Sequence, residues 1–188
     1  MTASDFITEL KEKPYTRIER KYEVSTERGQ YYITEKFRYA SSRETFEGGI
    51  ACHIPETKTR SEFGDADIDI VFDSSKDKPR ATIKDVQVNS RVNNKGIGTQ
   101  CMLAAISFIK AVKEYYGIKE KVRFAGWLSA VDKDLGNWDR SVPFYYKVGE
   151  KAGVEHFFEV NGISEKYYTP EEFLANVGNN HGSIVYMV

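Results

Sequence analysis

The chain has few of the residues that mark secreted, metal-binding or membrane proteins. It contains only two cysteines and three histidines among 188 residues, too few for a disulfide framework and without the spacing of zinc ligands. No apolar run is long enough to cross a bilayer, and the first residues lack the charged and apolar regions of a signal peptide. We therefore expect a cytoplasmic protein with no metal site and no membrane partner.

An excess of charge of one sign is also lacking. The 27 basic and 28 acidic side chains leave a formal net charge of -1, and no basic block interrupts this balance. Domains that bind nucleic acids usually carry a basic patch or stripe, so we expect no nucleic-acid partner. A chain of this length is enough for one domain with a sizeable core, and we expect a single domain over residues 1–188.

The clearest element that the sequence does contain is a long amphipathic segment from Ile97 to Tyr116. Its apolar side chains recur every three or four residues, which places them on one face of a helix. Strand-like sequences flank this segment at 81–89 and 122–128. Residues 81 to 128 therefore predict a strand, a crossover helix and a second strand.

The joint between the first of these strands and the helix predicts an anion site. Gly96 and Gly98 let the main chain approach a phosphate, and the start of a helix carries unpaired N–H groups and partial positive charge. A P-loop needs a lysine after its second glycine, but Lys95 precedes Gly96. A dinucleotide fingerprint needs a third glycine or alanine where Cys101 stands.

The segment from Val88 to Thr99, Val-Asn-Ser-Arg-Val-Asn-Asn-Lys-Gly-Ile-Gly-Thr, instead resembles the acetyl-CoA loop of the GCN5-related N-acetyltransferases, the GNAT family. The family pattern is Gln or Arg, two residues, Gly, one residue, then Gly or Ala. Asn93 stands at the Gln/Arg position here, with Arg91 and Lys95 as neighbouring basic residues. The cofactor-binding residues that the resemblance implies are Val88, Ser90, Asn93, Asn94, Lys95, Gly96, Ile97, Gly98 and Thr99.

The resemblance also implies a fold class and a reaction. The fold is α+β, a mixed and largely antiparallel central sheet of about seven strands, splayed between the fourth and fifth, with helices on both faces. The cofactor is acetyl-CoA, with coenzyme A as the product. The acetyl group passes to a primary amine of an unidentified small-molecule or peptide acceptor, by direct attack in a ternary complex.

A second stretch, Ser141-Val-Pro-Phe-Tyr-Tyr-Lys-Val-Gly149, resembles the Phe-Tyr-x-Lys-x-Gly-Phe segment on the last helix of the family. Ser141 is the expected cap of this helix. In the family the tyrosine hydroxyl lies near the thioester sulfur, so Tyr145 is the candidate general acid, with Tyr146 as the alternative. A different register takes Gly153 as the glycine that ends the helix, and it places Gly149 at the tyrosine position.

The general base is harder to assign. Asp85, on the strand that precedes the loop, is our candidate, and Glu47, His53 and Asp69 on nearby strands are the alternatives. Each of these residues also fits a solvated position on a strand.

The rest of the sequence predicts mostly strands. We expect a helix capped by Ser4, a hairpin of residues 15–25 and 30–39, strands at 44–54, 66–72, 154–160 and 183–188, and a short helix capped by Thr169. The family usually has two helices after its first strand, where this chain is strand-like. A non-catalytic module that binds coenzyme A, or a partner through tyrosine-rich segments, is the alternative function. The acceptor, the acyl chain length and the oligomeric state, including a homodimer, are open.

Overall fold

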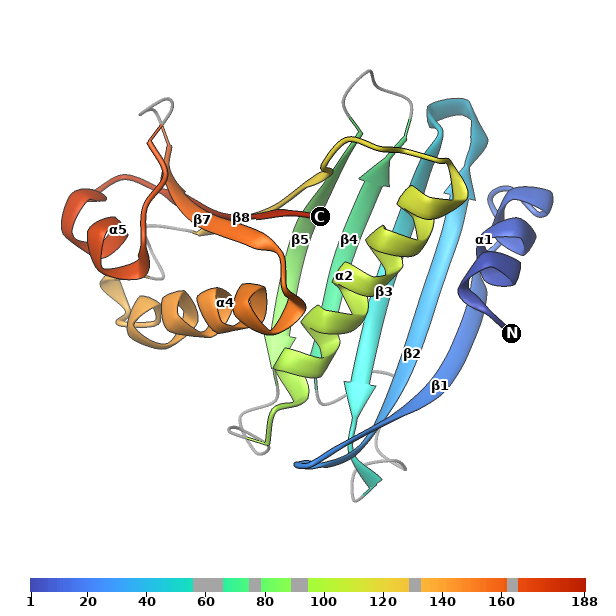
Figure 1. Cartoon of the computed structure of the whole chain (residues 1–188), viewed down its shortest axis with the longest axis horizontal. Coiled ribbons are helices and arrows are strands. Elements are labelled where there is room, and N and C mark those ends of the chain that lie inside the picture. The colour runs from blue at the N-terminus through green and yellow to red at the C-terminus, as the bar shows by residue number, and fades with distance from the viewer. Residues whose placement is uncertain (56–65, 75–78, 89–94, 129–132, 162–165) are drawn as a thin grey trace. The chain divides into compact units, whose positions relative to one another are not determined.

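The structure is a computed structural model that describes residues 1–55, 66–74, 79–88, 95–128, 133–161 and 166–188. These residues form two compact units, Met1–Val122 and Arg123–Val188, each of which is described by itself. The elements of unit 1 are α1 (Ala3–Glu12), β1 (Ile18–Thr26), β2 (Gly29–Ala40), the short 3-10 helix η1 (Ser41–Arg43), β3 (Thr45–His53), β4 (Ala66–Asp73), β5 (Arg80–Val88) and α2 (Ile97–Tyr115), as Figure 1 shows. The elements of unit 2 are β6 (Arg123–Leu128), α4 (Trp138–Ala152), β7 (Glu155–Val160), α5 (Pro170–Asn176) and β8 (Gly182–Met187).

Unit 1 is built on five antiparallel strands that lie side by side in chain order, from β1 to β5. The predicted hairpin of β1 and β2 is formed, and its residues pair from Ile18 opposite Phe37 to Thr26 opposite Gly29. Gly29 has a φ of 134°, which only glycine adopts readily. The turn is therefore defined by its sequence.

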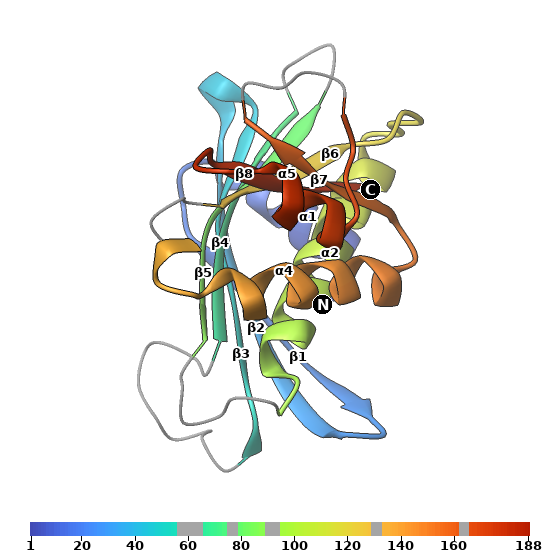
Figure 2. The ribbon, with the colours of Figure 1, turned by 90° about the vertical axis from the view of Figure 1, so that its left-hand side faces the viewer.

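Both helices of unit 1 lie on the same face of this sheet, which Figure 2 shows from the side. Along β2 the side chains alternate between buried and more exposed, as on a strand covered on one face. Phe108 of α2 stacks on Phe37 of β2 with ring centroids 4.0 Å apart. Phe6 of α1 packs edge-on against Phe108, with ring centroids 6.4 Å apart. These aromatic contacts join both helices to the sheet in one core.

A charged group lies inside this core. Glu35 of β2 is fully buried, at a position where alternation along the strand predicts an apolar side chain. Arg20 of β1 donates to both of its carboxylate oxygens, each at 2.9 Å, and the hydroxyl of Tyr22 donates to one of them at 2.9 Å. Burial and the Glu35 carboxylate raise the pKa of Tyr22, so Tyr22 remains a donor to the buried carboxylate.

Tyr15 is an exposed side chain that should titrate unusually early. Hydrogen bonds to its phenolic oxygen from the Ser41 hydroxyl (3.3 Å) and the Ser42 N–H (3.1 Å) stabilise the phenolate and lower the pKa of Tyr15 to about 8. Because the folded pKa lies below the ordinary value of 10.0, the stabilisation is present in full above pH 10. It is lost as the pH falls towards 8.

We expect ultraviolet absorbance of the native protein to show one phenolate forming near pH 8, and the variant Tyr15→Phe to lack this step. Folding stability of the wild type should rise relative to the variant between pH 8 and pH 10. An unchanged titration curve in Tyr15→Phe would contradict the assignment.

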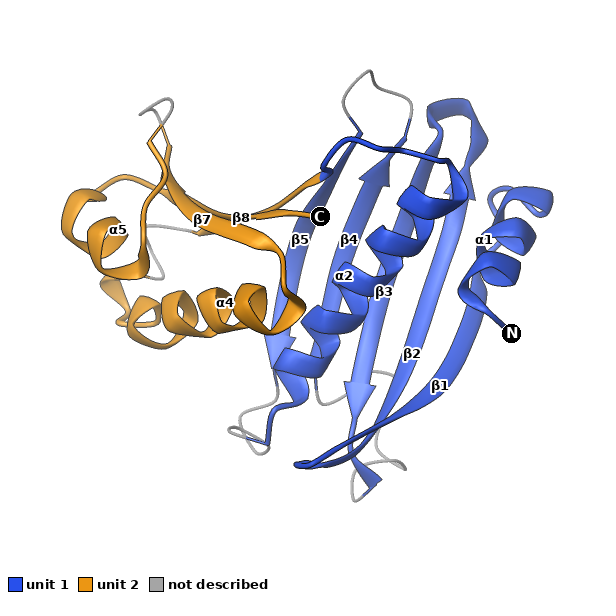
Figure 3. Ribbon diagram, viewed as in Figure 1, with its two compact units in different colours: residues 1–122 blue, residues 123–188 orange. Residues whose placement is uncertain are grey.

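Unit 2, coloured orange in Figure 3, has three antiparallel strands in the order β6, β8, β7. Helices α4 and α5 pack on one face of these strands. Phe173 of α5 lies between Trp138 of α4 and Phe158 of β7, with ring centroids 5.2 and 5.0 Å away. Thr169 and Glu172 form the predicted capping box at the start of α5.

The described residues confirm the α+β class and the largely antiparallel strands, of which eight are formed. Each unit has its helices packed on its own strands: α1 and α2 in unit 1, and α4 and α5 in unit 2. Two cap predictions were wrong. Thr2 rather than Ser4 caps α1, and Ser141 lies inside α4, where its N–H bonds the carbonyl of Asn137.

The expected splay lies between the strand that leads to the loop, β5, and the strand that follows α2, β6. These strands belong to different units, so the splay remains a prediction, as does the single domain. Over the ranges that the structure describes, no helix is both long and apolar enough to cross a membrane.

Candidate functional site

The start of α2 presents free main-chain donors. The helix begins at Ile97, and the first bond of its ladder runs from the N–H of Gln100 to the carbonyl of Gly96 at 3.0 Å. No described residue accepts a hydrogen bond from the N–H groups of Ile97, Gly98 or Thr99, and no side chain caps the helix. Three adjacent donors at the positive end of a helix dipole suit the charge of an anion.

Gly96 sets the direction in which the chain enters this helix. Its φ of 78° and ψ of 4° lie in the left-handed region, which costs a residue with a Cβ atom about 1–2 kcal/mol. A Cβ on Gly96 would also lie 3.1 Å from the hydroxyl oxygen of Tyr31. The glycine that the sequence motif requires is therefore explained by backbone conformation and by a close neighbour.

Tyr31 of β2 holds the loop from the side. Its ring is buried, with 1% of its surface exposed, and its hydroxyl donates a 2.8 Å hydrogen bond to the carbonyl of Lys95. This bond engages a carbonyl oxygen that would repel an anion if it pointed towards the helix start. Because its ring is buried, Tyr31 cannot belong to a tyrosine-rich surface that binds a partner.

Cys101, in the first turns of α2, anchors the helix to the sheet. Its thiol lies 3.1 Å from the carbonyl of Ile50 and 3.6 Å from that of Ala66. Burial raises the pKa of Cys101 well above its ordinary value. The thiol therefore stays protonated and serves packing rather than nucleophilic chemistry.

The strand that leads to the loop carries an irregularity. Asp69 of β4 pairs with Asp85 of β5 and Ile70 with Ile83, so Lys84 is the extra residue of a bulge, a feature that is frequent near active sites. Asp85 is exposed and accepts a 2.7 Å hydrogen bond from Gln87. Asp85 and Gln87 lie on the face of the sheet that points away from α2.

The other predicted residues of this region are placed as follows. Val88 ends β5 opposite Ala66, with 41% of its surface exposed. Lys95 is exposed, next to Gly96. Ser90, Asn93 and Asn94 lie outside the described residues.

The alternative bases lie in three different surroundings. Glu47 accepts hydrogen bonds from Arg38 and Arg43, and the bond from Arg38 lowers the pKa of Glu47. His53 stacks on Tyr32 with ring centroids 5.4 Å apart. A Cβ on Gly49 would lie 2.8 Å from Oδ1 of Asp69, so this carboxylate lies across Gly49. An ion-paired carboxylate is a poor proton acceptor, which counts against Glu47.

The helix of the second motif ends at Gly153 rather than Gly149. Gly153 has a φ of 62° at the C-cap of α4, and the N–H of Val154 bonds the carbonyl of Gly149 at 3.3 Å. This is the arrangement of a glycine that ends a helix. The end of the helix at Gly153 is the one that the second register expects, and Gly149 lies inside the helix.

The imidazole of His156 fills the space beside Gly149. A Cβ placed on this glycine would therefore overlap the ring. Nδ1 of His156 lies 2.7 Å from the carbonyl of Val154. The ring of Tyr146 packs edge-on against the imidazole at 4.5 Å. Tyr145 is half-buried, and its carbonyl accepts a 2.8 Å hydrogen bond from Tyr186. Tyr145 and Tyr146 belong to unit 2, whereas the loop belongs to unit 1.

Two neighbours of the loop were not predicted. Tyr31 and Arg28 come from the first hairpin, and their side chains reach Gly96, as the 3.1 and 3.8 Å separations from its Cβ position show. The sequence predicted a turn at residues 26–29, which include Arg28, and a strand at 30–39, which includes Tyr31. It carried no signal that this hairpin lies beside α2, because that proximity depends on the order of strands in the sheet.

The chain has similar solved structures but no matching family model. No model of a protein family matches the chain, and no curated protein matches its sequence. Among solved structures, one similar chain is assigned as a streptothricin acetyltransferase from Bacillus anthracis in complex with acetyl coenzyme A, with 13% identity and a TM-score of 0.40 over 94% of this chain and 87% of that one. Another is nourseothricin acetyltransferase, with 12% identity and a TM-score of 0.41 over 96% and 91% of the two chains. Likeness at this level carries no conclusion, so the interpretation rests on the residues of the site.

Proposed function

We propose that this chain is an acetyl-CoA-dependent N-acetyltransferase that acetylates a primary amine of a small-molecule or peptide acceptor. The observation that carries the proposal is that the N–H groups of Ile97, Gly98 and Thr99, which follow the left-handed Gly96, have no acceptor among the described residues. Together with the resemblance of this loop to the acetyl-CoA loop, these donors suit the diphosphate of coenzyme A.

In the proposed reaction the amine attacks the thioester carbonyl, a nitrogen–carbon bond forms and the carbon–sulfur bond breaks. A base takes the proton from the amine, and an acid protonates the departing thiolate. Asp85 is the proposed base. Tyr145 is the proposed acid and Tyr146 its alternative. The main chain of Val88 and Ser90 is proposed to bind the pantetheine arm and the thioester oxygen.

A second candidate function is a module that binds coenzyme A without transferring an acetyl group. The end of α4 at Gly153 favours it, because this register puts Gly149, which has no ionisable side chain, at the position where the family has tyrosine. Both candidates share the same anion site.

Isothermal titration of the purified protein with acetyl-CoA, NAD and ATP tests the proposal. We expect binding of acetyl-CoA and no binding of NAD or ATP. The loop lacks the third glycine of a dinucleotide site, and it lacks the lysine that follows the second glycine of a P-loop. Absent acetyl-CoA binding, or equal binding of all three ligands, would refute it. Release of free thiol in the presence of polyamines, aminoglycosides, amino acids or peptides then separates the enzyme from the binding module.

A further inference from the structure

The turn between β1 and β2 brings an arginine to the start of α2. The turn and the helix start lie at the same end of the sheet in Figure 1. The position that a Cβ atom of Gly96 would occupy lies 3.8 Å from Cδ of Arg28 and 3.9 Å from its Nη1. The guanidinium of Arg28 therefore lies against the residue that precedes the free N–H groups.

Arg28 carries a positive charge that no described carboxylate neutralises. Three other arginines of unit 1 are paired, Arg20 with Glu35 and both Arg38 and Arg43 with Glu47. Arg17 and Arg80 have no ion pair among the described residues, but neither is among the residues that lie against Gly96. Arg28 is exposed and has no ion pair among the described residues. It thus adds a free cation to a place that is already positive through the helix dipole.

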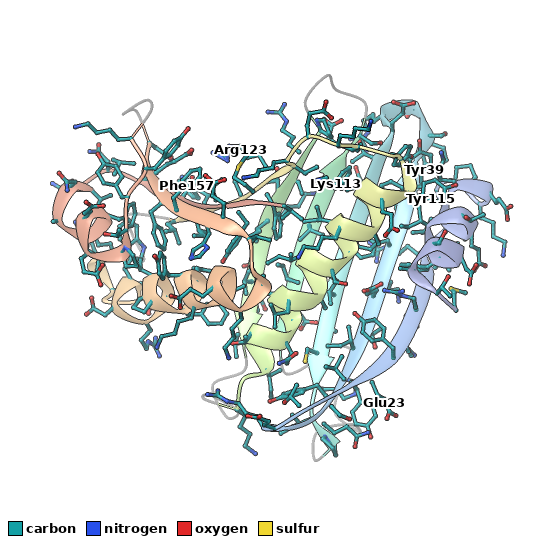
Figure 4. The ribbon with its side chains drawn as sticks, viewed as in Figure 1. Glu23, Tyr39, Lys113, Tyr115, Arg123 and Phe157 are labelled. Atoms are coloured by element: carbon teal, nitrogen blue, oxygen red, sulfur yellow. The ribbon has the colours of Figure 1, made fainter. Side chains whose placement is uncertain are left out.

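Hydrogen bonds within the turn fix the main chain of Arg28. The main-chain N–H of Arg28 donates to the Thr26 hydroxyl at 3.1 Å, and that hydroxyl bonds the carbonyl of Gly29 at 3.3 Å. Glu23, labelled in Figure 4, is the acidic residue of β1 near the turn, and it accepts a 2.6 Å hydrogen bond from Gln30. Tyr31, in the same hairpin, bonds Lys95 and ties the hairpin to the loop.

We propose that Arg28 binds the diphosphate of coenzyme A together with the N–H groups of Ile97, Gly98 and Thr99. This inference rests on the proposed function. A guanidinium presents its donors in a planar fork that matches two phosphate oxygens, and such charge-assisted bonds are stronger than neutral ones. The hairpin supplies the side-chain donor, and the helix start supplies the main-chain donors.

Titration of coenzyme A into Arg28→Gln tests the proposal. We expect the variant to bind about tenfold more weakly than the wild type, the loss of one charge-assisted contact. The matched control is Arg17→Gln, which removes an exposed arginine of the same unit with the same change in net charge and should bind within about twofold of the wild type. Arg28→Lys, which keeps the charge and loses the fork, should fall between the two.

The same titrations with dephospho-coenzyme A identify the phosphate. This ligand retains the diphosphate and lacks the 3′-phosphate, so Arg28→Gln should lose the same factor. A loss that disappears with dephospho-coenzyme A would assign Arg28 to the 3′-phosphate and overturn the inference. Equal affinities of Arg28→Gln and Arg17→Gln for coenzyme A would overturn it as well, while wild-type binding keeps the proposed function intact. Failure of the wild type to bind would instead refute the proposed function.

Discussion

Replacing Glu35 with alanine is expected to lower the free energy of unfolding by about 3–5 kcal/mol, the cost of leaving one member of a buried ion pair alone. Arg20, with 12% of its side chain exposed, would lose both of its bonds to the carboxylate. Tyr22 would lose its acceptor. Urea unfolding followed by circular dichroism measures the change through the midpoint at constant slope.

Two controls separate the lost charge pair from lost packing. Glu19→Ala removes a carboxylate whose ion pair with Lys36 is exposed, and it should cost no more than about 1 kcal/mol. Replacing both charges, with Arg20→Met and Glu35→Leu together, should restore most of the loss, because apolar side chains of similar volume can substitute for a buried pair. A cost for Glu35→Ala as small as that for Glu19→Ala would contradict this account of the core.

Replacing Gly96 with valine is expected to weaken acetyl-CoA binding about a hundredfold, as the loss of two hydrogen bonds to the diphosphate predicts. A β-branched residue at a φ of 78° is strongly disfavoured, and its Cβ would press on the Tyr31 hydroxyl 3.1 Å away. The chain must then leave the left-handed conformation, and the N–H groups that follow no longer converge.

The matched control is Gly117→Val, at the opposite end of the same helix. Gly117 has a similar φ of 64°, but nothing lies within 4 Å of its Cβ position. This variant should lose stability through backbone strain and keep the affinity for acetyl-CoA. Isothermal titration of both variants, after their folding has been verified by circular dichroism, decides between a local effect and a general one. Equal losses of affinity in the two variants would show that strain anywhere in α2 is sufficient, against our interpretation.

The elements of the fold follow largely from local pattern. The apolar repeat of three or four residues predicted α2 to within one residue at its end, since a single helix with one buried face shows its period directly. The turn at Thr26 to Gly29 and the capping box at Thr169 were also predicted, because each depends on residues close in sequence. The cap at Ser141 was wrong, because the sequence around Pro143 suits more than one helix start and packing of Trp138 in the core begins the helix earlier.

The candidate site divides in the same way. The amino-acid sequence by itself determined that two glycines open a long helix after a strand, and hence where an anion could bind, because these features depend on conformational freedom and periodicity within a short segment. Only the tertiary structure decided that Tyr31 and Arg28 stand beside Gly96 and that Glu35 is buried with Arg20. Those neighbours are far apart along the chain, and the order and register of five strands bring them together. No local pattern carries that information.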